Sequence, residues 1–216
     1  MPSGTVLILI ILIAICAWGA GSWLVLRGIE QPKYVVEEVR DGYEIRTYEP
    51  YIVAETVVST ANESQALNAG FRLIADYIFG NNVGQQKISM TSPVTSAELQ
   101  SEKISMTAPV ISSETATGTR KVAFIMPSKY TLETLPKPNN DAVVLREVGA
   151  HTVAAKTFSW YASNDRIETK KGQLRAALQQ DGITVSSDIT YAGYNPPLSA
   201  PFVQRHEILI DIVYEK

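Results

Sequence analysis

A pattern of β-rich and helical runs occurs twice in this chain, at a constant interval. Residues 45–58 align with residues 145–158 without a gap, and the aligned pairs include Arg46 with Arg146. In each half a pair of β-rich runs is followed by an amphipathic helical pattern and then by further β-rich runs. An order β-β-α-β-β that occurs twice predicts an α+β fold made of two similar halves about a pseudo-twofold axis.

Strands are predicted where β-branched and aromatic residues form alternating or continuous runs. These runs cover residues 34–39, 43–48, 51–58, 121–127, 142–148, 152–158, 189–194 and 206–214. The Asp41-Gly42 pair between the first two runs is typical of a tight hairpin turn.

Two segments have the apolar spacing of amphipathic helices. The first follows Thr60, which opens a capping-box pattern, and Gly80 is a natural stop for it. The second is predicted to be capped by Ser163 or Asn164 and to end near Gln180.

An octapeptide also occurs twice, between the two halves. Residues 87–94 read KISMTSPV and residues 103–110 read KISMTAPV. Apolar and hydroxyl-bearing side chains alternate in both copies, which predicts two strands that each end at a proline. Met90 and Met106 then either pack in the core or line a ligand pocket, because thioethers adapt to flat or irregular apolar ligands.

The run Lys-Ile-x-Met-Thr-x-Pro-Val resembles the signature of the SOUL family of haem-binding proteins. Three further stretches resemble the opening hairpin, the late turn and the last strand of that family. These are residues 43–51, 192–197 and 201–208. The last stretch departs from the usual Arg-Arg-Asn-Glu-type run at Gln204 and His206. The resemblance covers about residues 34–214 and implies a distorted eight-stranded barrel or sheet flanked by two helices.

The resemblance implies non-covalent binding of haem or another tetrapyrrole by a carrier, buffer or sensor. A duplicated layout of this kind leaves a cleft between helix and sheet, which is a common place for a flat apolar ligand. A porphyrin site needs a slot of apolar and aromatic groups, with cations for two propionates. The candidates for this slot are Phe71, Arg72, Ile74, Tyr77, Ile78, Met90, Met106, Tyr191 and Tyr194. The same residue types equally form an ordinary core.

Iron could take a histidine or a methionine as its axial ligand. The chain has two histidines: His151 stands where the strand predicted at 152–158 starts, and His206 lies in the last predicted strand. SOUL-like proteins do not all supply an axial histidine at a shared position, so neither residue inherits that role from the resemblance. Each is equally consistent with an ordinary strand histidine, and Met90, Met106 and Met126 are the soft alternatives.

The first segment of the chain is uncharged from residue 4 to residue 26. As a helix it would be roughly 35 Å long, enough to cross a hydrocarbon core of about 30 Å. Trp18 and Trp23 lie near its end and Arg27 follows it, as at a membrane interface. A cleaved signal peptide is the alternative, although it would have a basic start and a shorter apolar stretch.

The chain therefore divides into a membrane anchor at residues 1–27, a linker at 28–33 and a haem-binding domain at 34–216. Arg27 and Lys33 flank the anchor on one side, which favours a single-pass protein with a cytoplasmic domain.

Composition and motifs exclude several classes of function. A net charge of −3 and a pI near 5.5 argue against a nucleic-acid partner. The sole cysteine, Cys16, lies in the apolar segment, so the rest of the chain has no disulfide or thiolate metal site. The sequence contains no Gly-x-Ser-x-Gly elbow, phosphate loop or His-Glu-x-x-His motif. A non-catalytic binder is predicted. The alternatives are a general apolar-ligand module resembling multidrug effector-binding domains, a scaffold at the membrane, and an enzyme acting on tetrapyrroles.

Overall fold

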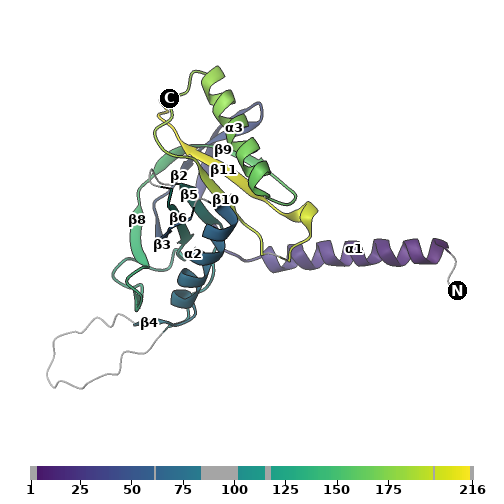
Figure 1. Ribbon diagram of the computed structural model, residues 1–216, viewed down its shortest axis with the longest axis horizontal. Coiled ribbons are helices and arrows are strands. Elements are labelled where there is room, and N and C mark those ends of the chain that lie inside the picture. The colour runs from purple at the N-terminus through teal and green to yellow at the C-terminus, as the bar shows by residue number, and fades with distance from the viewer. Residues whose placement is uncertain (1–3, 61, 84–101, 115–117, 197, 215–216) are drawn as a thin grey trace.

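The computed structural model describes residues 4–60, 62–83, 102–114, 118–196 and 198–214 (Figure 1). The helices are α1 (Gly4–Leu26), α2 (Glu63–Ile78), α3 (Asn164–Gln180) and the short 3₁₀ helix η1 (Pro201–Val203). The strands are β1 (Tyr34–Arg40), β2 (Tyr43–Tyr48), β3 (Tyr51–Val58), β4 (Asn82–Val83), β5 (Val110–Glu114), β6 (Arg120–Ile125), β7 (Lys137–Pro138), β8 (Val144–Val148), β9 (His151–Phe158), β10 (Thr190–Gly193) and β11 (His206–Asp211).

The large sheet has nine antiparallel strands in the order β1-β2-β9-β11-β10-β5-β6-β3-β8. The elements β2, β3, α2, β5 and β6 of the first half correspond to β8, β9, α3, β10 and β11 of the second. Exchanging the members of each pair reverses the order of the eight strands, so the β5–β10 pair lies on the pseudo-twofold axis. This arrangement confirms the duplicated α+β fold, and β1 is an addition at one edge.

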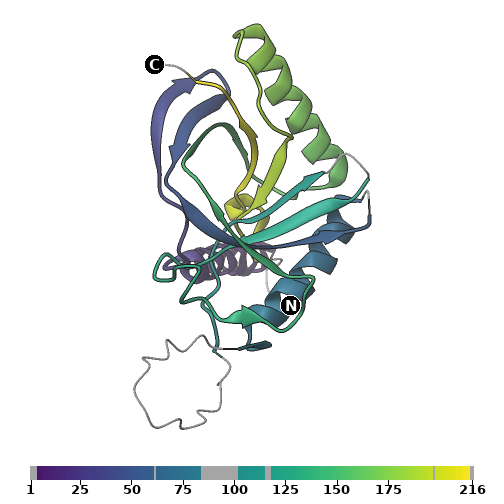
Figure 2. The same cartoon turned by 90° about the vertical axis from the view of Figure 1, so that its left-hand side faces the viewer.

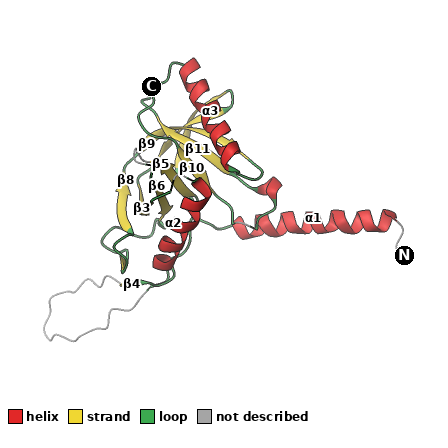
Figure 3. Cartoon of the chain, viewed as in Figure 1, coloured by secondary structure: helices red, strands yellow, loops and turns green. Residues whose placement is uncertain are grey.

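The sheet curls into a half-barrel, and α2 and α3 cover one of its faces (Figures 2 and 3). The α2 helix packs on β3 and β6, and α3 packs on β9 and β11. Because successive side chains of a strand point to opposite faces, Ala54 packs under α2 while Val53 belongs to a cluster on the other face. Both faces of the sheet are therefore apolar at their centres.

The N-terminal caps of α2 and α3 are side chains of the expected type. Asn62 caps α2, since its Oδ1 accepts a hydrogen bond of 3.1 Å from the backbone N–H of Gln65. Thr60 instead donates to the side chain of Gln65, so the predicted capping residue is wrong by two positions. Ser163 caps α3 as predicted.

The second octapeptide corrects a prediction, because residues 103–109 are not a strand and β5 begins only at Val110. The N–H of Ile104 donates to the carbonyl of Ile78 at the end of α2, over 2.9 Å. Ile104 is 1% exposed whereas Met106 is 43% exposed, so the two side chains do not share a face. The first octapeptide, with Met90, lies outside the described residues.

The α1 helix projects away from the half-barrel (Figure 1). Within the described part of the chain, residues 4–24 form one helix that is long and apolar enough to cross a membrane. The predicted linker lies against the domain, since the carbonyl of Glu30 accepts from the N–H of Ala108 over 3.0 Å. The carboxylate of Glu30 also accepts from the N–H of Ser128 over 2.8 Å. These contacts fix the segment between α1 and β1 on the surface of the domain.

Candidate functional site

The face of the sheet opposite α2 and α3 carries a hollow of about 490 Å³, which we call the inner groove. Its apolar lining includes Tyr51, Ile111, Ala123, Val148, Val153 and Leu209. Its polar lining includes Glu55, Lys121, Arg146, His151, Asp188 and Asp211. Strands of both halves contribute, so the inner groove extends across the pseudo-twofold axis.

His151 begins β9 and lies half-buried at the inner groove. Its Nδ1 is 2.9 Å from the carbonyl oxygen of Gly149. A carbonyl can only accept, so Nδ1 carries the proton and the lone pair of the neutral ring lies on Nε2. The ring is stacked on Tyr48 with centroids 5.6 Å apart, and Tyr51 meets it edge-on at 5.7 Å. A histidine held in this tautomer and orientation is typical of metal ligands.

A cationic pair lies on the wall of the inner groove. Arg146 donates two hydrogen bonds to Glu55, of 3.3 and 3.0 Å, and Lys121 Nζ lies 3.5 Å from the same carboxylate. Burial by itself raises the pKa of Glu55, but the hydrogen bond and charge of Arg146 and the charge of Lys121 outweigh it and lower the pKa. Two cations therefore share one carboxylate at this wall, whereas Asp188 and Asp211 add two further carboxylates elsewhere in the lining.

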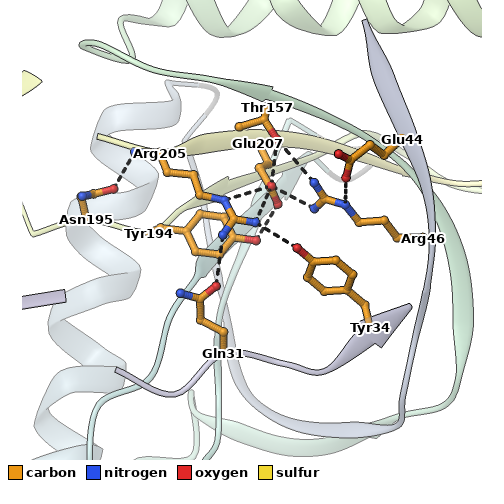
Figure 4. A network of polar contacts seen from close by, with 9 residues as sticks. All are labelled: Gln31, Tyr34, Glu44, Arg46, Thr157, Tyr194, Asn195, Arg205 and Glu207. Carbon is orange, nitrogen blue, oxygen red and sulfur yellow. Dashed lines mark hydrogen bonds and ion pairs between the residues drawn. The ribbon is translucent and has the colours of Figure 1, made fainter. Parts of the chain in front are cut away.

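A buried carboxylate organises the adjoining part of the same face (Figure 4). Glu207 is fully buried and receives Arg46 at 2.9 Å and Arg205 at 2.8 Å. Thr157 and Tyr194 donate their hydroxyls to it over 3.0 and 2.6 Å. Burial would raise the pKa of Glu207, but the charges of the two guanidinium groups prevail and lower it.

The Glu207 network ties together elements that are far apart in the chain. Arg46 comes from β2 and Glu207 from β11, with β9 between them. Arg205 also donates to the side chain of Gln31 over 3.2 Å, which links the network to the segment after α1. Because both carboxylate oxygens of Glu207 are engaged, the network acts as a structural clamp.

His206 lies on the opposite face of the sheet, beneath α3. Its Nδ1 is 2.8 Å from the hydroxyl of Tyr191, and its Nε2 is 3.2 Å from Oε1 of Gln204. The amide nitrogen of Gln204 donates to the carbonyl of Ser199, so its Oε1 is the acceptor for His206. Both ring nitrogens of His206 thus have partners, and burial lowers its pKa.

The sequence candidates are distributed over several places. Ile74, Tyr77 and Ile78 are at most 1% exposed and pack together between α2 and the sheet. Tyr77 also donates its hydroxyl to the carbonyl of Pro136 over 2.9 Å. These side chains fill the space between helix and sheet in which the sequence placed a ligand cleft.

The remaining candidates do not join this group. Phe71 packs on Phe124 with ring centroids 5.4 Å apart and is partly exposed. Arg72 and Met106 are exposed. Tyr191 bonds to His206 under α3, whereas Tyr194 belongs to the Glu207 network. The structure thus brings three of the α2 candidates together and separates them from both tyrosines.

Sequence reasoning singled out His151 but did not identify the other residues of the inner groove. Glu55, Lys121 and Arg146 come from three strands that are neighbours in the order β6-β3-β8. One signal was available in the sequence. A strand with apolar residues at successive positions has an apolar side chain on each face, so the sheet must have a second apolar surface besides the one covered by the helices.

The family model described as "SOUL heme-binding protein" matches residues 29–99 and 95–211 of the chain. Human heme-binding protein 2 is 27% identical over 158 residues, which cover 73% of this chain and 72% of that protein. Heme-binding protein 1 of Xenopus laevis is 27% identical over 187 residues, covering 85% and 92% of the two chains.

Solved structures are similar in fold. The C-terminal domain of EcmrR matches with a TM-score of 0.58 at 7% identity, over 80% of this chain and 99% of that one. A hydrolase from Listeria innocua matches with a TM-score of 0.52 at 9% identity, over 82% and 94%. At these identities the likeness establishes the curled two-half sheet with its helices.

Proposed function

This chain belongs to the SOUL heme-binding protein family, and from that premise we propose that it binds haem or a related tetrapyrrole in the inner groove without transforming it. One observation carries the choice of groove. The imidazole of His151, with the lone pair on Nε2, borders the same hollow as an apolar lining and the cationic pair of Lys121 and Arg146. These are the groups that a flat apolar ring with two carboxylates and a central iron requires.

The lining of the inner groove fits the chemistry of haem. A porphyrin face would lie against the apolar residues, as most bound flat ligands lie against hydrophobic and aromatic groups. Its propionates would lie at the wall formed by β3, β6 and β8, where Lys121 and Arg146 share Glu55, and away from Asp188 and Asp211 in the rest of the lining. Haem supplies an iron that accepts an axial nitrogen, and Nε2 of His151, which lies 3.9 Å from a carboxylate oxygen of Asp211, would supply that nitrogen among the residues described on this face.

A binding role also agrees with the state of the ionisable groups. The carboxylate of Glu207 accepts hydrogen bonds from four residues, so it is not poised as a general base. We further propose that α1 tethers the domain to a membrane, where the protein acts as a carrier, buffer or sensor of its ligand.

The proposal is tested with the full chain in detergent micelles, titrated with ferric haem and with iron-free protoporphyrin. Saturable binding of both ligands is expected, with a shift of the haem Soret band. The His151→Ala variant should still bind the iron-free ring but should change the ferric spectrum, because it removes an axial nitrogen and leaves the apolar lining.

His206→Gln is the matched control, since this histidine lies on the other face of the sheet and should leave the ferric spectrum unchanged. Absence of a Soret shift at micromolar haem would overturn haem binding. A shift that His151→Ala leaves unaltered would instead place the iron ligand elsewhere.

A second ligand class is favoured by another hollow, of about 380 Å³, beside the segment that follows α1. Among the described residues, its lining contains Glu30, Glu49, Glu133 and Glu147 but only one cation, Lys33, next to apolar residues such as Met126. An acidic, partly apolar hollow suits a planar cation better than a dicarboxylate porphyrin. A cationic dye that binds more tightly than porphyrin, and equally well to His151→Ala, would support this alternative.

A further inference from the structure

The α1 helix is docked on the domain near its C-terminal end. The indole Nε1 of Trp18 donates to the carbonyl of Leu198 over 3.0 Å, and the N–H of Ala200 donates to the hydroxyl of Ser22 over 2.9 Å. Gly19 lies so close to the ring of Phe202 that a Cβ on it would be 2.8 Å from the ring edge. Residues 198–202 therefore lie directly alongside α1 (Figure 1).

The position of this docking contact conflicts with a domain that stands clear of the bilayer. The candidate span Gly4–Leu24 has 21 residues, a length of about 31 Å that matches a hydrocarbon core of about 30 Å. Trp18 lies six residues before Leu24, roughly 9 Å along the helix axis. If α1 crosses a membrane, the residues docked on Trp18 and Ser22 must reach the depth of the interface.

The docked surface has the composition that this depth requires. Leu198 is 87% exposed, and Phe202, Trp160 and Tyr161 are each about half exposed. Residues 189–204 and 157–164 contain no charged side chain. Trp and Tyr favour the membrane–water interface because they join an apolar ring to a polar group.

Trp160 is held against residues 198–202, the segment docked on α1. The backbone N–H of Trp160 donates to the carbonyl of Pro201 over 3.1 Å. Trp160 has φ of 76°, in the left-handed region that bulky residues rarely adopt.

At the end of α1, the guanidinium of Arg27 lies 3.9 Å over the ring of Trp23, which places a cation at the level of the headgroups.

We propose that Leu198, Phe202, Trp160 and Tyr161 form an interfacial patch that sits in the headgroup and upper acyl region of the bilayer beside α1. The proposal rests on the proposed membrane anchor. The patch and the helix act as one membrane-contacting unit, so the domain is seated on the lipid surface in a fixed orientation. Peripheral apolar elements of this kind are buried roughly 5–10 Å into the headgroup and acyl boundary, which agrees with the depth of the docking contact.

The test uses the full chain with Cys16→Ser, reconstituted in phosphatidylcholine vesicles, and one environment-sensitive fluorophore at a time. Labels are placed through Leu198→Cys, Tyr161→Cys, Ile10→Cys and Val144→Cys. Val144 is the control, since it is exposed on the edge strand β8. Lipids carry a nitroxide quencher either near the headgroup or near the end of the acyl chain.

The label at Ile10 should be quenched by the deep nitroxide, which shows that α1 is inserted. Labels at Leu198 and Tyr161 should be quenched more by the shallow nitroxide than by the deep one and should shift to shorter wavelength, while Val144 does neither. Quenching at Ile10 with Leu198 and Tyr161 behaving like Val144 would overturn the patch alone. An unquenched Ile10 would overturn the anchor and the patch together.

Discussion

Among single residues, Glu207 combines complete burial with a negative charge that two guanidinium groups neutralise. Glu207→Gln removes the buried carboxylate partner of Arg46 and Arg205 and leaves Arg46 only the partly exposed Glu44, and removing one partner of a buried ion pair typically costs about 3–5 kcal/mol. We expect a loss of that size in the free energy of unfolding, measured by denaturant titration. Glu44→Gln is the control, because Glu44 bonds the same Arg46 from a partly exposed position and its loss should cost less than about 1 kcal/mol. Equal losses in the two variants would contradict the clamp.

The pH dependence of this pair has a definite sign. The pKa of Glu207 in the folded state is lowered from 4.5, so its contribution is complete above pH 4.5 and is lost as the pH falls through the folded pKa. Glu207→Gln should therefore show a flatter stability profile at acidic pH than the unaltered chain.

His206 predicts a second pH window. Burial lowers its pKa from 6.5, with further lowering from the charge of Arg166. Below pH 6.5 the unfolded chain takes up a proton that the folded chain does not, so stability falls until the pH reaches the folded pKa. His206→Gln should abolish this fall in thermal unfolding followed between pH 7 and 5, whereas His151→Gln should retain it. A fall that survives His206→Gln would assign it to another group.

The two histidines show why a site residue cannot be chosen from sequence alone. His151 stands next to one predicted strand and His206 begins another, and in the structure both are the first residue of a strand. Only the folded sheet shows that His206 gives both nitrogens to Tyr191 and Gln204, while His151 keeps Nε2 beside the inner groove. That difference depends on which face each strand residue takes, and strand register sets the face.

At the scale of elements, the backbone of α2 at Gly70 packs directly against the sheet, because glycine has no side chain to hold the two apart. A Cβ at Gly70 would lie 2.5 Å from the Cβ of Val122 on β6. We expect Gly70→Ala to destabilise the fold, because overpacking costs about 1–3 kcal/mol and outweighs the gain of up to about 1 kcal/mol in helix propensity. Gly172→Ala in α3 has no atom within 4 Å of its Cβ and should instead stabilise by about 0.5–1 kcal/mol. The measurement is the free energy of unfolding, and equal signs for the two variants would contradict this packing.

Helices and strands were predictable where the local residue pattern agrees with the repeat of the two halves. The interval between β3 and β9 is that of the sequence repeat, and both helices end near the predicted positions. The strand predicted for the second octapeptide is wrong. Its residues alternate as in a strand, but its backbone N–H groups donate to the carbonyls of Ile78 and Glu30. In that segment, hydrogen bonds to residues distant in the sequence determine the backbone conformation, although the local pattern favours a strand.

At the scale of the whole molecule, the inner groove is assembled from strands of both halves. The sequence repeat predicts that two halves exist, but it does not give the order in which their strands meet. The contact of Glu55 with Arg146 spans 91 residues, and it forms because β3 pairs with β8. Family resemblance therefore predicted the ligand class, whereas the residues proposed to hold it required the sheet order.

The docking of α1 also belongs to this scale, because it fixes the domain relative to the helix axis. Gly19→Leu places a side chain where the ring of Phe202 lies, so it should separate α1 from η1. The angle between the helix and the domain should then vary over a wider range. Gly21→Leu adds the same side chain where no atom lies within 4 Å and should leave the angle unchanged.

The measurement is the distance distribution between spin labels at Ile10→Cys and Val144→Cys, in the Cys16→Ser chain in vesicles. One label reports on α1 and the other on the far edge of the sheet. Gly19→Leu should widen the distribution, because the remaining contacts of Glu30 hold only the segment after the helix. Gly21→Leu should keep the narrow distribution of the parent. A narrow distribution in both variants would mean that the contact of Gly19 with Phe202 does not orient the domain, and that the contacts of Trp18, Ser22 and Glu30 suffice.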